Sequence, residues 1–255
     1  AGEAEARGAR HVFIVASKNL NRRTDVVEKI RKRLADRHAG TFDEVAEHTP
    51  RASVIAALTA ARAAQADMLV SVGGGTSIDA VKVMLVCMAK GVETEADMSD
   101  CHMRVLEDGS RFVPEIGPVP CAHIAVPTTL SGAEFSNLGG STDPVRKIKD
   151  GYTATGINPA TVILDPEATL HTPDWLWQST GIRGVDHAVE GICATEPSPL
   201  VDGCSLQALR LFGEALPATK RQPSDLGARL AWQQAAWLAG SNILRVRFGA
   251  SHGIG

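Results

Sequence analysis

The fold is decided at Met68-Leu-Val-Ser-Val-Gly-Gly-Gly-Thr-Ser-Ile-Asp79, where a strand-like apolar run meets three glycines and the start of a helical pattern. Glycines let the backbone turn sharply and let a ligand approach it closely. A helix that begins at such a turn offers N–H groups and the positive end of its dipole to an anion. The combination suits a pyrophosphate. It is neither the G-x-G-x-x-G pattern nor a Walker loop, however, and a turn without a ligand can show the same letters.

Strand-like and helix-like segments alternate on both sides of this turn. Short apolar runs occupy residues 11–16, 122–126 and 161–164, and residues 40–45 read as a weaker strand. Helical spacing occupies residues 21–35, 53–66 and 77–89. Beyond residue 165 only helical segments follow, at residues 173–178, 181–194, 199–216 and 223–244. Such alternation indicates a mostly parallel sheet covered on both faces. We therefore predict an α/β dinucleotide-binding domain over residues 1–167 and an all-α domain with the substrate or metal site over residues 168–255.

Composition excludes several classes of protein. The 255 residues carry a formal net charge of -3, without the basic excess typical of nucleic-acid binding. The five cysteines form no C-x-x-C pair, which favours reduced thiols in a cytoplasmic protein. No apolar run reaches the roughly 18 residues expected of a membrane span. We therefore expect a small-molecule substrate, and neither nucleic acid nor a membrane as a partner.

A second polar loop follows a strand at Val126-Pro-Thr-Thr-Leu-Ser-Gly-Ala-Glu134. Its hydroxyls and N–H groups could hold a phosphate, a ribose or a nicotinamide amide, or could simply cap the loop. In open α/β sheets the ligand crevice lies at the carboxyl ends of the strands. Two such loops in the expected order therefore indicate a dinucleotide more specifically than either loop alone.

Five ordered motifs carry a family resemblance: Gly73-Gly-Gly-Thr-Ser-Ile-Asp79 with Lys82, Pro127-Thr-Thr129 with Glu134, Asn158-Pro-Ala-Thr-Val-Ile-Leu-Asp-Pro166, Thr180-Gly-Ile-Arg-Gly-Val-Asp-His-Ala-Val-Glu190 and Ala250-Ser-His-Gly-Ile-Gly255. Together they resemble the iron-containing alcohol dehydrogenase superfamily over nearly the whole chain. The resemblance implies an NAD(P)-dependent oxidoreductase with its site between an N-terminal dinucleotide domain and a C-terminal helical domain. It also implies a homodimer.

The resemblance implies a set of cofactor-binding residues for NADH or NADPH. By position, Gly74, Gly75 and Thr76 would hold the pyrophosphate, Asp79 would lie near the nicotinamide, Thr128 and Thr129 would line the adenosine and phosphate side, and Lys149 would line the ribose side.

Cofactor preference is left open by the first strand. Ser17 follows that strand, where NAD-preferring relatives often carry an acid that would repel a 2′-phosphate. With Ser17 there, NADP is not excluded, whereas Asp43 or Glu44 after the second strand would still favour NAD.

The metal site of the family is altered in this chain. Metal-dependent members use an Asp and a His four residues apart on one helix, followed by two later histidines. Here His187 matches the first His and His252 the second, but Arg183 stands at the Asp position, and the chain stops at Gly255 before a third His. A guanidinium cannot ligate a divalent cation. We therefore expect no metal and an incomplete helical domain; if the enzyme is metal-dependent, His187 and His252 are its ligands here.

Arg183 has two interpretations. It forms a salt bridge with a nearby acid on its own helix, or it binds a substrate carboxylate through its planar fork. Maleylacetate reductases, a branch of the superfamily that acts in aromatic-compound catabolism, match the sequence around Arg183 and are reported not to need a metal. This resemblance implies reduction of an unsaturated oxo-dicarboxylate, with His187 or His252 supplying a proton or a hydrogen bond and Arg183 binding the anion.

Two alternatives stay open beside this hypothesis. The first is an iron- or zinc-dependent NAD(P) alcohol dehydrogenase with an unusual ligand set. The second is a nucleotide-binding module without catalytic activity. Metal analysis separates the first alternative from the reductase, and turnover assays separate the second.

Overall fold

The computed structural model describes residues 1–196, 198–243, 245–247, 249 and 251. Contacts divide the chain into two compact units. Unit 1 comprises residues 1–126 and 137–163, and unit 2 comprises residues 127–136 and 164–255. This division differs from the predicted boundary after residue 167 by four residues. It also places the loop 127–136, which lies inside the predicted first domain, with the helices of unit 2.

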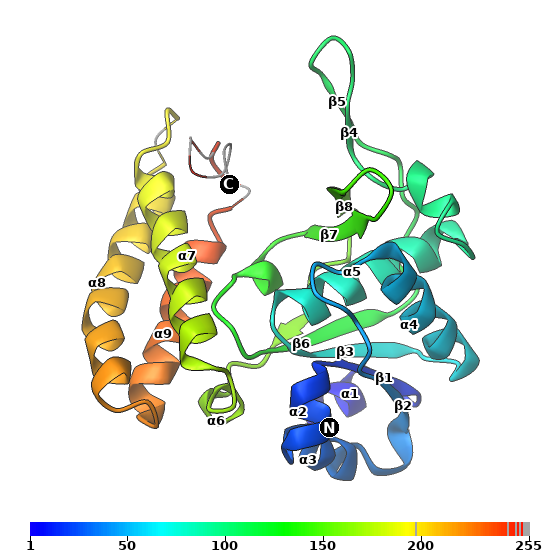
Figure 1. Cartoon of the computed structure of the whole chain (residues 1–255), viewed down its shortest axis with the longest axis horizontal. Helices are drawn as coiled ribbons and strands as arrows, with labels where there is room; N and C mark the ends of the chain where they lie inside the picture. The colour runs from blue at the N-terminus through cyan, green and yellow to red at the C-terminus, as the bar shows by residue number, and fades with distance from the viewer. Residues whose placement is uncertain (197, 244, 248, 250, 252–255) are drawn as a thin grey trace. The chain divides into compact units, whose positions relative to one another are not determined.

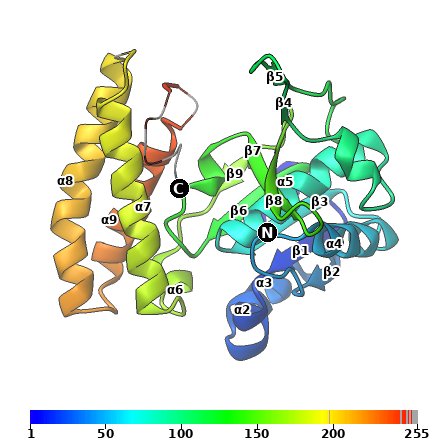
Figure 2. The ribbon, with the colours of Figure 1, turned by 45° about the horizontal axis from the view of Figure 1, so that its top comes forward.

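A five-stranded sheet forms the centre of unit 1, in the order β2-β1-β3-β6-β9 (Figure 1; β9 is labelled in Figure 2). The strands are β1 (Val12–Ala16), β2 (His38–Phe42), β3 (Met68–Gly73), β6 (Ala122–Pro127) and β9 (Thr161–Val162). The pairs β1–β2, β1–β3 and β6–β9 are parallel. The predicted parallel sheet is therefore confirmed, with strand positions close to those expected from the apolar runs.

Helices cover both faces of this sheet. One face packs against α1 (Gly2–Ala6), α2 (Lys18–Arg23) and α3 (Val26–Leu34), and the other against α4 (Arg51–Ala63) and α5 (Gly75–Lys90). Within β1, Val12 and Ile14 face the first group, whereas Phe13 and Val15 face the second. A strand buried on both sides needs a continuous apolar run, as its sequence shows.

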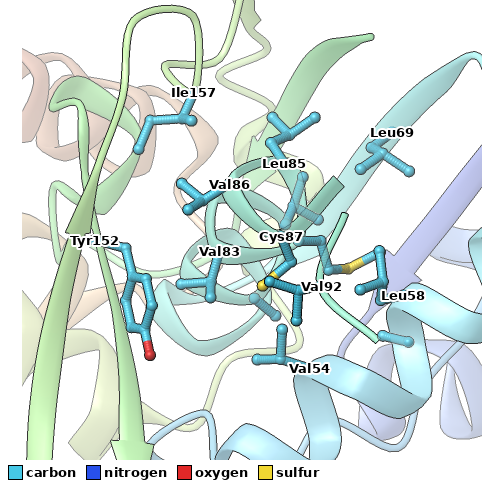
Figure 3. Close-up of a cluster of buried hydrophobic side chains, with 14 of the residues drawn as sticks. Val54, Leu58, Leu69, Val83, Leu85, Val86, Cys87, Val92, Tyr152 and Ile157 are labelled. Atoms are coloured by element: carbon cyan, nitrogen blue, oxygen red, sulfur yellow. The ribbon is translucent and has the colours of Figure 1, made fainter. Parts of the chain in front are cut away.

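Two antiparallel hairpins in unit 1 were not predicted. They are β4 (Arg104–Val105) with β5 (Arg111–Phe112), and β7 (Leu138–Asp143) with β8 (Ile148–Thr153). The β7–β8 hairpin packs on α5, and Tyr152 lies beside Val83 and Val86 in this core (Figure 3). Short 3-10 turns among the described residues are η1 (Ala35–Arg37), η2 (Asp97–Asp100) and η3 (Ala133–Phe135).

Unit 2 is helical in the part of the chain that is described (Figure 2). Its helices are α6 (Pro166–Thr169), α7 (Asp174–Ile192), α8 (Pro199–Arg221) and α9 (Leu226–Gly240). The core centres on Trp177, Phe212 and Trp232. Helix α7 is continuous where the sequence predicts two helices, and within it the Thr180 hydroxyl donates to Leu176 O at 2.7 Å. None of the described helices has the length and apolar character to cross a membrane.

Candidate functional site

The glycine turn lies at the point where the strand order reverses. The chain passes from β1 to β2 on one side and then to β3 on the other, so β1 and β3 flank the switch point. Ser17 N donates to Val72 O at 2.9 Å, which places Ser17 beside the turn. Gly73 has φ +151°, and a Cβ on it would lie 2.7 Å from Ser77 Oγ and 3.3 Å from Ser17 Cβ. The turn therefore requires glycine, and it stands where open α/β sheets bind their ligands.

Helix α5 presents its N-terminus at this turn. The N-cap is Gly74, which has no side chain to cap the first N–H groups, and Gly75 and Thr76 begin the 16-residue helix. A helix of this length places its positive dipole end and its first N–H groups at the turn. A helix N-terminus that begins at glycines suits a pyrophosphate, and the binding role of Gly74, Gly75 and Thr76 stays a prediction.

Asp79 and Lys149 form an ion pair in unit 1. Lys149 Nζ lies 2.8 Å from Asp79 Oδ2, with Asp79 nearly buried and the Lys149 side chain about half exposed. The lysine runs over β7, where a Cβ on Gly140 would lie 2.2 Å from Lys149 Cε. Two residues that the resemblance placed on the nicotinamide and ribose sides of the cofactor therefore meet directly. Gly140, which allows the contact, was not identified from the sequence.

An open cavity of about 590 Å³ lies beside this lysine, between the segment before β4 and the strand β8. Its wall includes Arg104 and Lys149. Beneath it the buried Arg51 bridges Asp143 at 3.5 Å and Asp150 at 2.8 Å. Hydrogen bonds from Arg146, on its backbone and side chain, lower the pKa of Asp143 to about 2. No local sequence pattern reports these pairs, because Arg51 lies in α4 and its two acids lie in the β7–β8 hairpin.

The acids after β2 are already engaged by cations. Arg22 contacts both Asp43 and Glu44, and Lys18 pairs with Glu44 at 2.9 Å. From their position in the sequence, either acid is expected to favour NAD. In the structure both acids serve first as partners for basic side chains of α2.

In unit 2 the loop 127–136 is fastened to the helices by its backbone. Thr172 Oγ1 donates to Thr128 O at 2.7 Å, and Leu130 N donates to Thr180 Oγ1 at 3.1 Å. Thr128 and Thr129 are both buried, and Thr129 Oγ1 has no hydrogen-bond partner among the described residues. Buried hydroxyls normally find a partner. These two threonines, predicted to bind the cofactor, therefore belong structurally to the helical unit.

Arg183 forms a salt bridge with an acid of its own helix, which is one of the two roles expected from the sequence. Its Nη1 lies 2.8 Å from Asp186 Oδ2, and the side chains of Arg183 and Asp186 are 41% and 23% exposed. Among the residues that the structure describes, no three His, Cys, Asp or Glu side chains gather closely enough to hold a metal ion. His252 lies outside the described residues.

His187 brings the two motifs of unit 2 together. Its ring is buried in α7, and a Cβ on Gly132, which has φ +73°, would lie 3.6 Å from His187 Nδ1. One turn further along α7, Glu190 Oε1 accepts a hydrogen bond from Ser251 N at 2.8 Å. The loop at 127–136 and the segment at 251 therefore both meet the helix that carries Arg183 and His187.

Family comparisons cover almost the entire chain. The family described as iron-containing alcohol dehydrogenase matches residues 1–166, and the C-terminal part of the Fe-containing alcohol dehydrogenase family matches residues 178–255.

Individual relatives point the same way. The chain is 34% identical over its full length to dehydrogenase FUM7 of Gibberella moniliformis, covering 63% of that protein. It is 30% identical over 98% of its length to maleylacetate reductase 2 of Cupriavidus pinatubonensis, covering 60% of that protein. The crystal structure of maleylacetate reductase from Rhizobium sp. strain MTP-10005 superposes with a TM-score of 0.79 at 26% identity, over 98% of this chain and 61% of that one. The chain thus spans about three-fifths of the length of these relatives.

Proposed function

Because the chain belongs to the iron-containing alcohol dehydrogenase family, we propose that it is part of an NAD(P)H-dependent reductase of maleylacetate or a similar unsaturated oxo-dicarboxylate, acting without a metal. The observation that supports this most is Arg183, which stands one helical turn before the buried His187 in α7. The names of the relatives, several of them maleylacetate reductases, support the same substrate class. A cytoplasmic homodimer that acts in aromatic-compound catabolism belongs to the same proposal.

Arg183 is suited to exchange its present partner for a substrate carboxylate. The Arg183–Asp186 pair is partly exposed, and such pairs contribute at most about 1 kcal/mol. A guanidinium presents several donors in a rigid fork and binds carboxylates in a bidentate manner. Exchanging Asp186 for a substrate carboxylate therefore costs Arg183 little free energy and provides a charge-assisted hydrogen bond to the substrate.

The remaining roles follow from the chemistry of the substrate. A carbon–carbon double bond conjugated to a keto group is already an electron sink, so Lewis-acid activation contributes less than it does for a simple carbonyl. A reduced nicotinamide cofactor, bound with its pyrophosphate at the α5 turn, would supply the hydride. A proton must then reach the neighbouring carbon, and His187 is our candidate for holding it, with His252 as the second candidate.

The test uses the full-length protein, with NADH and NADPH oxidation measured on maleylacetate and on simple aldehydes, with and without a chelator. We expect dicarboxylate turnover that a chelator leaves unchanged. Arg183→Gln should raise KM for the dicarboxylate about tenfold or more, since hydrogen bonds to charged groups contribute roughly 1.5–3 kcal/mol. Arg210→Gln is the matched control, because Arg210 forms an equally local helix pair with Glu214 at 2.6 Å.

Two outcomes would contradict the proposal. An equal KM for the dicarboxylate in Arg183→Gln and Arg210→Gln would show that Arg183 does not bind the substrate. Stoichiometric iron or zinc whose removal abolishes activity would favour the metal-dependent alcohol dehydrogenase. The hydrogen bond from Ser251 N to Glu190 supports that candidate, because it brings the residue before His252 to the helix that carries His187. Binding of NADH or NADPH without turnover of any keto acid or aldehyde would instead indicate a module without catalytic activity.

A further inference from the structure

Basic and acidic side chains meet at the carboxyl ends of β1 and β2, next to the glycine turn. We call this group the strand-end cluster: Lys18, Asn21 and Arg22 from α2, and Asp43 and Glu44 after β2. The cluster begins directly after Ser17, whose Cβ lies 3.3 Å from the position of a Cβ on Gly73. A dinucleotide with its pyrophosphate at that turn would bring its adenosine ribose toward this end of the sheet.

Asp43 is committed to the cluster's interior. Arg22 donates to it through Nε at 2.7 Å and through Nη2 at 2.9 Å, and Asn21 Nδ2 donates at 2.8 Å. The Asp43 side chain is only 10% exposed, and these donors lower its pKa, the Arg22 hydrogen bond most. A carboxylate held by three donors has little capacity left for a ribose hydroxyl. The bidentate pair instead orients the guanidinium of Arg22.

Glu44 is held much more loosely. Its carboxylate accepts from Lys18 Nζ at 2.9 Å and from Arg22, and the side chains of Lys18, Arg22 and Glu44 are each about half exposed. Exposed pairs of this kind contribute between zero and about 1 kcal/mol. A phosphate carries more charge than a carboxylate and can therefore replace Glu44 on both cations.

We propose that Lys18 and Arg22 bind the 2′-phosphate of NADP(H) in place of Glu44, so that this enzyme uses NADPH at least as well as NADH. The inference rests on the proposed nucleotide site at the α5 turn. Ser17 fits this assignment, because a serine beside the turn does not repel a 2′-phosphate. Asp43 does not oppose it either, because its bidentate pair with Arg22 neutralises that acid.

The experiment measures dissociation constants of NADPH and NADH by calorimetry or by nucleotide fluorescence, using the full-length protein and no substrate. Lys18→Gln should weaken NADPH binding about tenfold and change NADH binding less than about twofold. Glu44→Gln should tighten NADPH binding, because it removes the competing carboxylate. Lys29→Gln is the matched control, since Lys29 forms a similarly exposed pair with Asp25 at 2.9 Å. We avoid replacing Arg22 because that change would leave Asp43 without its main donor.

The possible results separate this inference from the proposed function. A wild-type preference for NADH of tenfold or more, or equal losses of both nucleotides in Lys18→Gln, would overturn the role of Lys18 and Arg22 while leaving the proposed function intact. Absence of binding by both nucleotides would overturn the proposed function and this inference together. Selective loss of NADPH in Lys18→Gln, with the Lys29→Gln control unchanged, would support it.

Discussion

The glycines at the end of β3 in unit 1 leave room for a ligand, whereas the glycines of α7 in unit 2 leave room for neighbouring side chains of the protein itself. At Gly73–Gly75 the absent side chains leave backbone N–H groups at a helix N-terminus open to a ligand. In α7 the absent side chains let aromatic rings from the neighbouring helices lie directly against the backbone. A Cβ on Gly181 would lie 1.5 Å from Trp232 Cζ3, and one on Gly184 would lie 2.6 Å from Phe212 Cζ.

This difference shows which residues of the Gly181–Glu190 motif are available for chemistry. Gly181, Gly184 and Ala188 are buried against α8 and α9, so they serve packing. Arg183 and Glu190 lie outside that packed face and keep partial exposure. This helix thus combines a packed face and a partly exposed face that carries Arg183 and Glu190. Changes in its glycines should affect stability, whereas changes in the turn after β3 should affect nucleotide binding.

Gly181→Ala tests the packing half of the comparison and should have the largest effect. The Trp232 ring cannot move aside easily, because its centroid lies 5.8 Å from that of Trp177 and 5.7 Å from that of Phe212. Overpacking usually costs about 1–3 kcal/mol, and a rigid neighbour places this change at or above about 3 kcal/mol. Urea unfolding of the full-length protein measures the loss.

The matched control for this change is Gly203→Ala in α8, where a Cβ would have nothing within 4 Å. That variant should keep or slightly raise stability, because alanine favours helix over glycine by about 1 kcal/mol. Equal stability of the two variants would mean that the α7 glycines do not serve packing.

Gly73→Ala tests the other half and should act mainly on nucleotide binding. Alanine is strained at φ +151°, and its Cβ would press on Ser77 and Ser17, so the turn must shift. We expect NADH and NADPH to bind at least about tenfold more weakly, which corresponds to about 1.4 kcal/mol. Titration of nucleotide fluorescence measures the change.

Gly91→Ala controls for backbone strain at the opposite end of α5. Gly91 has φ +68° and nothing within 4 Å of a Cβ, so alanine there should lower stability by about 1 kcal/mol without changing nucleotide affinity. If Gly91→Ala weakened nucleotide binding as much as Gly73→Ala does, the turn after β3 would have no special role.

Most strands of the central sheet could be predicted because they are local apolar runs, whereas β2, His-Ala-Gly-Thr-Phe, is only weakly strand-like. The hairpin β7–β8 could not, since its sequences, Leu-Gly-Gly-Ser-Thr-Asp and Ile-Lys-Asp-Gly-Tyr-Thr, carry glycines and charges instead of an apolar alternation. Its stability depends on packing against α5, which is remote in sequence. Similarly, Ser179-Thr180-Gly181 has the composition of a helix break, and α7 continues through it because Gly181 fits against Trp232.

For the candidate site, the sequence located single residues but not their partners. The glycine turn was predicted from its sequence pattern. The family resemblance indicated Asp79 and Lys149 as site residues but did not predict their ion pair. The pairing of Arg22 with Asp43 joins a helix to the end of a neighbouring strand, so no local pattern reports it. The roles assigned to Arg183, His187 and the other site residues remain predictions.

Gly191→Ala examines the weakest contact of the α7 face and should have the smallest effect. A Cβ there would lie 2.9 Å from Ser205 Oγ and 3.1 Å from Val201 Cγ1, which are ends of short side chains instead of a clamped ring. Ser205 Oγ also accepts from Asn242 Nδ2 at 3.0 Å, so moving it strains one hydrogen bond. The gain in helix propensity, about 1 kcal/mol, offsets this cost, and we expect a net change below about 1 kcal/mol in urea unfolding. In a double-mutant cycle, Gly191→Ala should destabilise the protein less when Ser205 is already alanine, because the hydroxyl that the new Cβ would contact is then absent. Strictly additive changes in unfolding free energy would show that the new Cβ and Ser205 do not interact.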